Sequence, residues 1–557
     1  MFTDARHISA NSQIDCDVVI VGAGAGGIPL ACEFLNSGWD VTLLEAGGAH
    51  TDRKTQDLYK GEVLDRVRHG PLEHYRRRCF GGTSTVWGGR CSPFDEIDFE
   101  RRSFVPESGW PIGKRDLDPY YARAHAYCHL GEYSYDVPTA LPGTQREMIP
   151  GLESDDVSQE HIWRFSLPTD MARSFGTALK HSPRVRVLLH ANCVRILTNE
   201  AGNAVSALRV TSLCRNEFHV RAKFFVLATG GLEVTRLLLV SNDVHRRGIG
   251  NDHDLLGRYY ASHIAGELAP VTFTPRGARL VWDYEKTHDG VYCRRNLSIR
   301  PSTQRREGLM NFRCILAPPP IADPTHRNAI LSSVYLVKRF LIHRIPPEYS
   351  KDLASPMTPY ERVLEHMRNV VIGSPQLAAF SCGWLNKRIL SERKLPSVML
   401  KNAANIYNLH FDAEQSPNRE SRVSLGEQKD ALGVNRLRVD WRFRAEDVQS
   451  VVRCFEIIRR DLQKSGVGVT GATDSEKLMD MIGASVGVGS HHYGTTRMSV
   501  DPKHGVVDAN CCVHGVDNLV IASSSVCPTT SFANPTLTIV ALSLRVADHI
   551  KGLLGRR

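Results

Sequence analysis

The hydrophobic pattern near the N-terminus predicts a strand–helix–strand unit. Residues 17–21 form a short apolar run of mainly β-branched side chains, which is typical of a strand buried on both faces of a parallel sheet. A helical pattern follows over residues 28–38, with Gly38 placed to end the helix. Residues 41–44 form a second apolar run that leads into Glu45. We therefore expect the chain to begin with a βαβ unit of a parallel sheet.

Related patterns recur far along the chain. Residues 185–197 and 205–220 alternate apolar and polar side chains as strands do, with a turn between them at 199–203. Residues 447–464 carry apolar side chains at helical spacing, which predicts an amphipathic helix packed on a core. Further strand patterns are expected at residues 423–425 and 436–441, and a last helix is expected at residues 536–551. This mixture indicates an α/β fold.

The turn after the first strand has a glycine spacing that suits a dinucleotide. The G-x-G-x-x-G pattern consists of Gly22, Gly24 and Gly27, with Ala25 and Gly26 inside it. Such glycines let the backbone approach a pyrophosphate, the helix start stabilises its charge, and an acid after the second strand binds a ribose. Glu45 stands at that acidic position and favours FAD or NAD over NADP, because a carboxylate disfavours a 2′-phosphate. The alternative, a turn needed only for packing, is disfavoured by the complete motif.

A second glycine-rich stretch covers residues 79–91. Its four glycines and three hydroxyl side chains leave backbone N–H groups accessible, which suits a second phosphate and the edge of a planar ring. The alternative is a flexible surface loop. Phe80 and Trp87 argue against that alternative, because aromatic side chains are uncommon in such loops.

Composition limits the partners and the location. The chain has 557 residues, 42% of them hydrophobic, which is enough for a large core in two lobes. The net charge of +9 is spread along the sequence, so we predict no nucleic-acid binding. The polar N-terminus and the short apolar runs predict neither a secretion signal nor a membrane span. The 14 cysteines are dispersed without a C-x-x-C pair, which predicts reduced thiols and a cytoplasmic protein.

The motifs together resemble the glucose–methanol–choline (GMC) oxidoreductases, a family of FAD-dependent enzymes that oxidise alcohols and sugars. The segments that carry the resemblance are residues 22–27, 81–89, 225–238, 490–498, 518–528 and 533–538. They follow the family order over nearly the whole chain. The resemblance implies a Rossmann-like FAD-binding domain with an interleaved α+β substrate-binding domain. We expect the FAD-binding domain in residues 1–95, 185–270 and 483–557, and the substrate-binding domain in residues 96–184 and 271–482.

The resemblance also implies which residues contact FAD. Val194 corresponds to a valine that lies against the adenine in the family. Some members attach FAD through a histidine of the second glycine stretch, but Val86 stands at that position and predicts non-covalent FAD. Many members have an aspartate where Ser523 stands, so that contact is either lost or made by the hydroxyl. The expected FAD-binding residues are Gly22, Gly24, Ala25, Gly26, Gly27, Glu45, Gly82, Thr83, Ser84, Trp87, Gly88, Val194, Ala228, Ser523, Asn534, Pro535 and Thr536.

His491 and Asn534 are the candidate catalytic residues. Histidine accepts protons near neutral pH and asparagine is a fixed hydrogen-bonding group, a pair that suits removal of a proton from a substrate hydroxyl. His491 matches the family's His-x-x-Gly, in which the histidine faces the flavin, and His492 should point elsewhere. Asn534 fits the family's second active-site position, and it could also be the N-cap of the last helix. We predict no metal site, because no further ligand stands at a suitable spacing.

We therefore predict an FAD-dependent oxidoreductase that oxidises a CH–OH group of a sugar, a polyol or a sugar-containing intermediate by hydride transfer to flavin N5. The alternatives are a non-sugar alcohol oxidase, an enzyme like the hydroxynitrile lyases of the family without net redox, and a nicotinamide dehydrogenase that uses only the first loop. The electron acceptor stays open among oxygen, a quinone and a redox protein. Residues 271–410 are expected to hold the substrate specificity.

Overall fold

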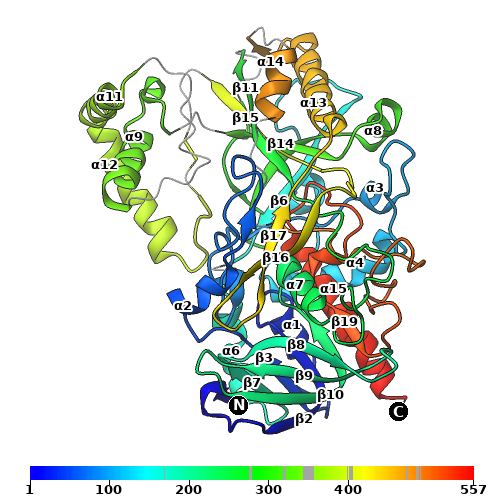
Figure 1. The fold of residues 1–557 in the computed structure, drawn as a ribbon. Helices are drawn as coiled ribbons and strands as arrows, with labels where there is room; N and C mark the ends of the chain where they lie inside the picture. The colour runs from blue at the N-terminus through cyan, green and yellow to red at the C-terminus, as the bar shows by residue number, and fades with distance from the viewer. Residues whose placement is uncertain are drawn as a thin grey trace.

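Two large sheets and a separate group of helices make up the fold (Figure 1). The computed structural model describes residues 1–167, 170–274, 279–317, 321–342, 357–397, 399–400, 405–471, 475–483, 489 and 491–556. Parts of the predicted substrate-binding range 271–482 and Ser490 of the histidine segment therefore lie outside the described residues. The predicted α/β fold class is confirmed.

The first sheet contains the parallel strands that the N-terminal pattern predicts. Strands β1, β7, β3, β2 and β10 lie side by side and run parallel, and β19 joins the end of β10 in the same direction. Strands β9 and β8 extend the sheet in antiparallel fashion. The bounds are β1 Phe2–Asp4, β2 Gln13–Val21, β3 Val41–Leu44, β7 Val185–Leu189, β8 Asn192–Thr198, β9 Val205–Thr211, β10 Glu217–Leu227 and β19 Leu519–Ile521. Distant parts of the sequence thus form one sheet.

The helix that follows β2 is shorter than predicted. Helix α1 spans Gly27–Cys32, whereas the sequence pattern predicted a helix over residues 28–38. Beyond Cys32, the N–H of Phe34 donates three residues back to the carbonyl of Ala31, so the chain continues as tighter turns. The Ser37 hydroxyl then donates to the carbonyl of Phe34 at 2.9 Å. This bond occupies a carbonyl that would accept a backbone N–H in a longer helix.

The second sheet is antiparallel throughout. Its strands follow the order β18–β11–β15–β14–β13–β6–β5, and β12 pairs with β13. The bounds are β5 Arg90–Cys91, β6 Val157–Phe165, β11 Ile264–Phe273, β12 Glu285–Lys286, β13 Tyr292–Ile299, β14 Phe312–Ala317, β15 Ile406–Ala413 and β18 Gly468–Thr470. A smaller sheet joins β16 Arg422–Lys429, β17 Asn435–Asp440 and β4 Glu62–Val63, which confirms the strands predicted at 423–425 and 436–441.

Long helices cover these sheets. Helix α15 (Pro535–Leu554) packs against α4 (Lys114–Tyr127) and α1 beside the first sheet. Helix α13 (Ala445–Lys464) presents an apolar face to the core of the second sheet, as its sequence pattern predicted. The other body helices are α2 Arg53–Gln56, α3 Glu96–Phe99, α5 Val137–Ala140, α6 Met171–His181, α7 Gly231–Val240, α8 Pro301–Glu307 and α14 Ser475–Gly483.

The predicted domain limits remain a proposal. Every strand of the first sheet falls within the ranges 1–95, 185–270 and 483–557. Strands β5 and β11 of the second sheet also begin within those ranges. The predicted FAD-binding domain therefore contributes strands to the second sheet near residues 90 and 264.

A further group of helices, here called the helical lobe, stands to one side of the sheets (Figure 1). It consists of α9 (Ala329–Val337), the helical turn η6 (Lys338–Ile342), α11 (Pro359–Ile372), α12 (Ser374–Leu385) and the turn η7 (Asn386–Leu390). These elements pack mainly against one another. Within the described ranges, every helix of the protein is too short or too polar to cross a bilayer.

Candidate active site

A cavity of about 430 Å³ lies where the first glycine loop, the second glycine stretch and the start of α15 meet. Side chains and backbone from the ranges 21–90, 191–240, 430–434 and 491–539 line it. It contains all the predicted site residues except Gly27, namely Gly22, Gly24, Ala25, Gly26, Glu45, Gly82, Thr83, Ser84, Trp87, Gly88, Val194, Ala228, His491, Ser523, Asn534, Pro535 and Thr536. The fold thus brings together residues that the sequence separates by up to about 500 positions.

The glycines of the first loop serve different purposes. Gly22 has φ of +102°, and a Cβ there would lie 2.6 Å from the carbonyl oxygen of Ala228. Gly27 does not line the cavity; a Cβ on it would lie 1.8 Å from the carbonyl oxygen of Gly22, so its role is close packing of α1 on the end of β2. A Cβ on Gly24 would meet nothing within 4 Å. Among the glycines of this loop, only Gly24 leaves open space where a side chain would stand.

Glu45 closes the end of β3 and is buried. Its carboxylate accepts hydrogen bonds from the N–H groups of Ala23 at 3.1 Å and Gly47 at 2.8 Å, and so fixes the glycine loop. Burial raises the pKa of Glu45 to about 7, although these hydrogen bonds oppose that shift. Glu45 therefore holds the loop in place as well as lining the cavity.

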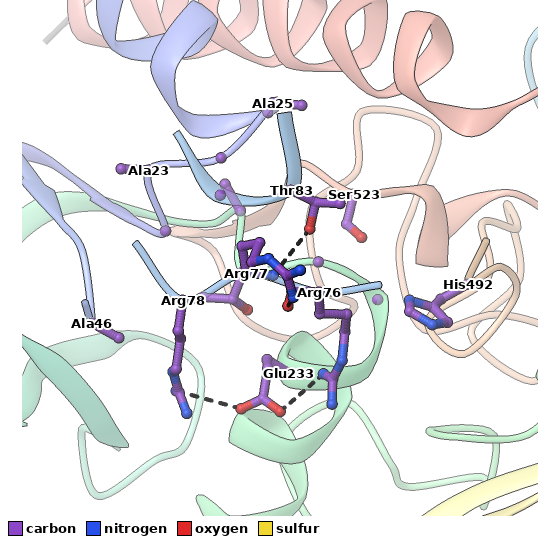
Figure 2. Close-up of a pocket in the computed structure, with 18 of the residues that line it drawn as sticks. Ala23, Ala25, Ala46, Arg76, Arg77, Arg78, Thr83, Glu233, His492 and Ser523 are labelled. Carbon is purple, nitrogen blue, oxygen red and sulfur yellow. Dashed lines mark hydrogen bonds and ion pairs between the residues drawn. The ribbon is translucent and has the colours of Figure 1, made fainter. Parts of the chain in front are cut away.

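The second glycine stretch folds into a short helical turn at Gly82–Thr85. Gly81 before it has φ of +96°, and the Ser84 hydroxyl donates to the carbonyl of Gly81 at 2.6 Å. The Thr83 hydroxyl accepts the N–H of Arg77 at 3.3 Å (Figure 2). Val86 also lines the cavity and is 53% exposed.

Arginines line part of this cavity (Figure 2). Arg76 and Arg78 both form ion pairs with Glu233, at 3.2 and 3.6 Å, and both guanidinium groups stack on the ring of Tyr59. Arg236 pairs with the same carboxylate at 3.4 Å. Positive charge exceeds the charge of Glu233, so this wall of the cavity is suited to an anion.

Three residues at the cavity have buried side-chain atoms without a hydrogen-bond partner among the described residues. The atoms are Nε and Nη1 of Arg78, the Thr229 hydroxyl and Asn192 Oδ1. Buried polar atoms are normally paired, so a polar ligand is expected to satisfy them. Together with the open space at Gly24, they fit a nucleotide cofactor with a pyrophosphate, such as FAD.

At the end of the cavity that holds His491 and Asn534, backbone pairing places two histidines together. Ala261 and Tyr493 form an antiparallel bridge, so His263 and His491, two residues from it on either side, face each other. Their Nδ1 atoms are 3.0 Å apart. The Tyr493 hydroxyl donates to the carbonyl of Ala533 at 2.8 Å and ties this segment to the turn that carries Asn534.

The hydrogen bonds around these rings determine their tautomers. His263 Nε2 lies 3.2 Å from the carbonyl oxygen of Thr530, which can only accept, so Nε2 carries the proton and Nδ1 is an acceptor. His491 Nδ1 must therefore donate to His263. The remaining nitrogen, His491 Nε2, then carries a lone pair, and Asn534 Nδ2 donates to it at 3.3 Å. His491 Nε2 is therefore an unprotonated nitrogen at the cavity, and a substrate hydroxyl must displace the Asn534 amide from it to deliver a proton.

Arg90 fixes the other side of Asn534. Its Nε donates to Asn534 Oδ1 at 2.9 Å, which orients the amide with Nδ2 toward His491. The guanidinium forms an ion pair with the buried Asp412 at 2.8 Å and lies over the Trp163 ring. Asn534 is the N-cap residue of α15, as one reading of the sequence expected, but its side chain makes no capping hydrogen bond. The amide faces the histidine instead.

Burial keeps the histidines neutral. Desolvation, followed by the electrostatic cost of protonating both members of the His263–His491 pair, holds the pKa of His491 well below its usual 6.5, and burial lowers the pKa of His263 to about 4. His492 also lines the cavity, but its Nε2 donates to the carbonyl of Gly489 at 3.1 Å, and burial lowers its pKa to about 3. Of the two adjacent histidines, only His491 presents an unprotonated nitrogen to Asn534.

Several residues of this site gave no signal in the sequence. His263, Arg90 and Asp412 sit in or beside strands of the second sheet, with no motif around them that marks a function. The arginines at 76–78 are adjacent in the sequence, but nothing in their pattern marked them as part of this cavity. Among the described residues, no group of three histidine, cysteine or acidic side chains could hold a metal ion.

A dinucleotide-type loop that shares a cavity with a neutral, oriented histidine defines a nucleotide-dependent oxidoreductase. The sequence model of the family described as GMC oxidoreductase matches residues 417–543. Paromamine 6′-oxidase of Streptomyces fradiae is 22% identical over 97% of this chain and 92% of its own, and the fructose dehydrogenase large subunit of Gluconobacter japonicus is 21% identical over 97% and 98%. The similarity to the GMC oxidoreductases, a family of FAD flavoproteins, thus consists of a family-model match at residues 417–543 and of distant relatives that align over nearly the whole chain.

The fold is also similar to a solved structure. A formate oxidase variant of Aspergillus oryzae RIB40, studied for FAD modification, superposes with a TM-score of 0.53 at 17% identity, over 99% of this chain and 100% of that one. This similarity supports the fold with its interleaved sheets.

Proposed function

We propose that this protein is an FAD-dependent enzyme that oxidises a CH–OH group of a sugar, a polyol or a sugar-containing intermediate, with His491 as the base. The observation that carries the proposal is the hydrogen-bond chain from Thr530 through His263 and His491 to Asn534, which leaves the lone pair of His491 Nε2 at the cavity. The names of the relatives, an oxidase of paromamine and a fructose dehydrogenase, support a sugar-like substrate.

The cavity offers FAD a complete set of contacts. The loop at 22–26 and the unpaired atoms of Arg78 and Thr229 would hold the pyrophosphate. Val194 would lie against the adenine, and Pro535 and Thr536 would lie at the flavin edge. The remaining predicted residues, Ala228, Ser523 and the stretch from Gly82 to Gly88, line the same space.

When bound, FAD supplies a hydride acceptor at its N5 atom. The work of the chain is to position the alcohol and remove its proton. His491 Nε2 accepts the hydroxyl proton while Nδ1 stays bonded to His263, so the ring cannot rotate away. The Asn534 amide, held by Arg90, orients the substrate oxygen beside that nitrogen. Because burial keeps His491 neutral, the base is ready at neutral pH without first losing a proton.

We further propose that FAD is bound without a covalent link, because Val86 offers no nucleophile at the position where some members have a histidine. Acid precipitation of the purified protein should therefore release all of the flavin into the supernatant. Flavin that stays with the precipitate would contradict this proposal and would direct attention to other nucleophiles at the cavity.

The experiment that tests the function is anaerobic reduction of the bound flavin by a panel of sugars, polyols and aminoglycoside-like alcohols. We expect bleaching of the flavin absorbance by at least one sugar-like alcohol. A substrate that is turned over without any bleaching would indicate a lyase instead, and a purified protein without flavin would indicate a nicotinamide enzyme. Mixing the reduced protein with oxygen, a quinone or a cytochrome and following reoxidation of the flavin identifies the electron acceptor. The cytoplasmic location stays a prediction.

A further inference from the structure

The outer helix of the helical lobe buries polar side chains against its neighbour. Surface helices normally turn an apolar face to the protein and a polar face to water. In α11 the two buried side chains are His366 and Asn369. His366 Nδ1 is hydrogen-bonded to the Ser332 hydroxyl of α9 at 2.9 Å, and Asn369 Nδ2 donates to the carbonyl of Pro324 at 2.8 Å. Hydrogen bonds therefore contribute to the contact that holds α11 against α9.

The opposite face of α11 is apolar and exposed. Tyr360, Leu364, Met367 and Val371 are spaced by four, three and four residues, so they form one stripe along the helix. Their exposed fractions are 72, 45, 52 and 74%. Of the nineteen large hydrophobic side chains that are exposed among the described residues, ten lie between positions 337 and 390. An apolar concentration of this kind marks an interaction surface.

The next two elements extend this surface. Helix α12 buries none of its side chains, and residues 371–386 contain no Asp, Glu, Lys or Arg. The turn η7 then exposes Ile389 and Leu390 beside the basic residues Lys387 and Arg388. With 12 residues, about 18 Å long, α12 is too short to cross a bilayer but long enough to lie along its surface.

The charge of the same segment is strongly positive. Residues 337–394 carry ten Lys and Arg against five Asp and Glu, a net charge of +5 out of +9 for the whole chain. A tenth of the sequence thus holds more than half of the net charge. Apolar side chains bordered by basic ones form the pattern of helices that lie in the surface of anionic membranes.

We propose that the helical lobe binds the surface of a bilayer that contains anionic lipids. The α11 stripe and α12 would lie at the boundary between headgroups and acyl chains, and Lys387 and Arg388 would contact the headgroups. The lobe stands away from the sheets, so it can reach a flat surface (Figure 1). A second copy of the chain is a less suitable partner for the same face, because two copies of the segment 337–394, each with a net charge of +5, repel each other.

The test is sedimentation of the purified holoprotein with vesicles of phosphatidylcholine alone and of phosphatidylcholine mixed with phosphatidylglycerol. We expect binding only to the mixed vesicles, and less of it as salt increases. The double variant Met367→Glu/Val371→Glu and the double variant Lys387→Glu/Arg388→Glu should each lower the vesicle affinity at least about tenfold. Val500→Glu is the matched control, since Val500 is apolar and 78% exposed but lies outside the lobe, and it should bind like the wild type.

Circular dichroism shows whether each variant is folded. The proposal is overturned if the wild type sediments with neither kind of vesicle, or if all three variants bind equally. It is also overturned if the wild type binds no vesicles but forms a dimer in analytical ultracentrifugation that Met367→Glu/Val371→Glu abolishes; the apolar face is then an interface between two copies.

Discussion

The first glycine loop and the histidine site line the same cavity but are built in different ways. The loop from Gly22 to Gly27 is one short piece of chain, and its function depends on backbone atoms and missing side chains. The histidine site consists of side chains from four separate segments, those of Arg90, His263, His491 and Asn534, joined end to end by hydrogen bonds. A site made of backbone atoms can be recognised from one continuous stretch of sequence. A network of hydrogen-bonded side chains cannot, because it depends on where the fold places each residue.

A single added methyl group in the glycine loop should cause the largest loss of stability and of FAD binding. A Cβ on Gly27 would lie 1.8 Å from the carbonyl oxygen of Gly22, a backbone atom that cannot move without shifting β2. Gly27→Ala should therefore lower the free energy of unfolding by at least about 3 kcal/mol and abolish FAD retention. Urea unfolding and flavin absorbance measure the two effects.

Gly24→Ala is the matched control for that change. The added methyl would meet no atom of the described chain within 4 Å, so stability without FAD should change by less than about 1 kcal/mol. Only the affinity for FAD should fall, since the methyl enters the cavity. If Gly27→Ala is as stable as Gly24→Ala, the glycines do not have the separate roles assigned to them.

The histidine site should instead respond to the loss of a hydrogen-bond acceptor. His263→Leu removes the acceptor for His491 Nδ1 and should slow flavin reduction at least about tenfold, with FAD still bound. His263→Asn keeps an acceptor oxygen and should stay within about threefold of the wild type. Stopped-flow measurement of the flavin reduction rate in both variants shows whether His263 orients the base or only fills space. Equal rates in the two variants would show that His263 only fills space.

The features that could be predicted from the sequence are those formed by neighbouring residues, and the features that could not are those formed by distant side chains. The strands at 17–21 and 41–44 and the loop between them were predicted because each depends on its neighbours in the chain. The helix predicted at 28–38 was too long, because the tighter turns after Cys32 depend on side-chain hydrogen bonds such as the one from the Ser37 hydroxyl. His263 could not have been predicted, because its meeting with His491 follows from a backbone bridge between residues more than 200 positions apart.

The pH dependence of stability tests the burial of the histidines. Native pKa values of about 4 for His263 and about 3 for His492 lie below the value of 6.5 for the free side chain. Between these values the unfolded chain binds protons that the native one does not, so stability is complete above pH 6.5 and falls as the pH decreases. Each such histidine contributes about 1.4 kcal/mol per pH unit to that loss.

The variant His492→Gln isolates one contribution without touching the hydrogen-bond chain. Its free energy of unfolding should fall less steeply below pH 6.5, by about 1.4 kcal/mol per pH unit relative to the wild type. His253→Gln, at an exposed position, is the control. If His492→Gln and the wild type have the same slope, His492 is not held neutral by the fold.

The central claim is that His491, and not its neighbour His492, is the base. The most direct measurement is the rate of anaerobic flavin reduction by a saturating substrate in His491→Ala and His492→Ala, each with its bound FAD confirmed by absorbance. We predict that His491→Ala slows reduction at least about 10²-fold and that His492→Ala stays within about threefold. A wild-type rate in His491→Ala, or a larger loss in His492→Ala, would contradict the account.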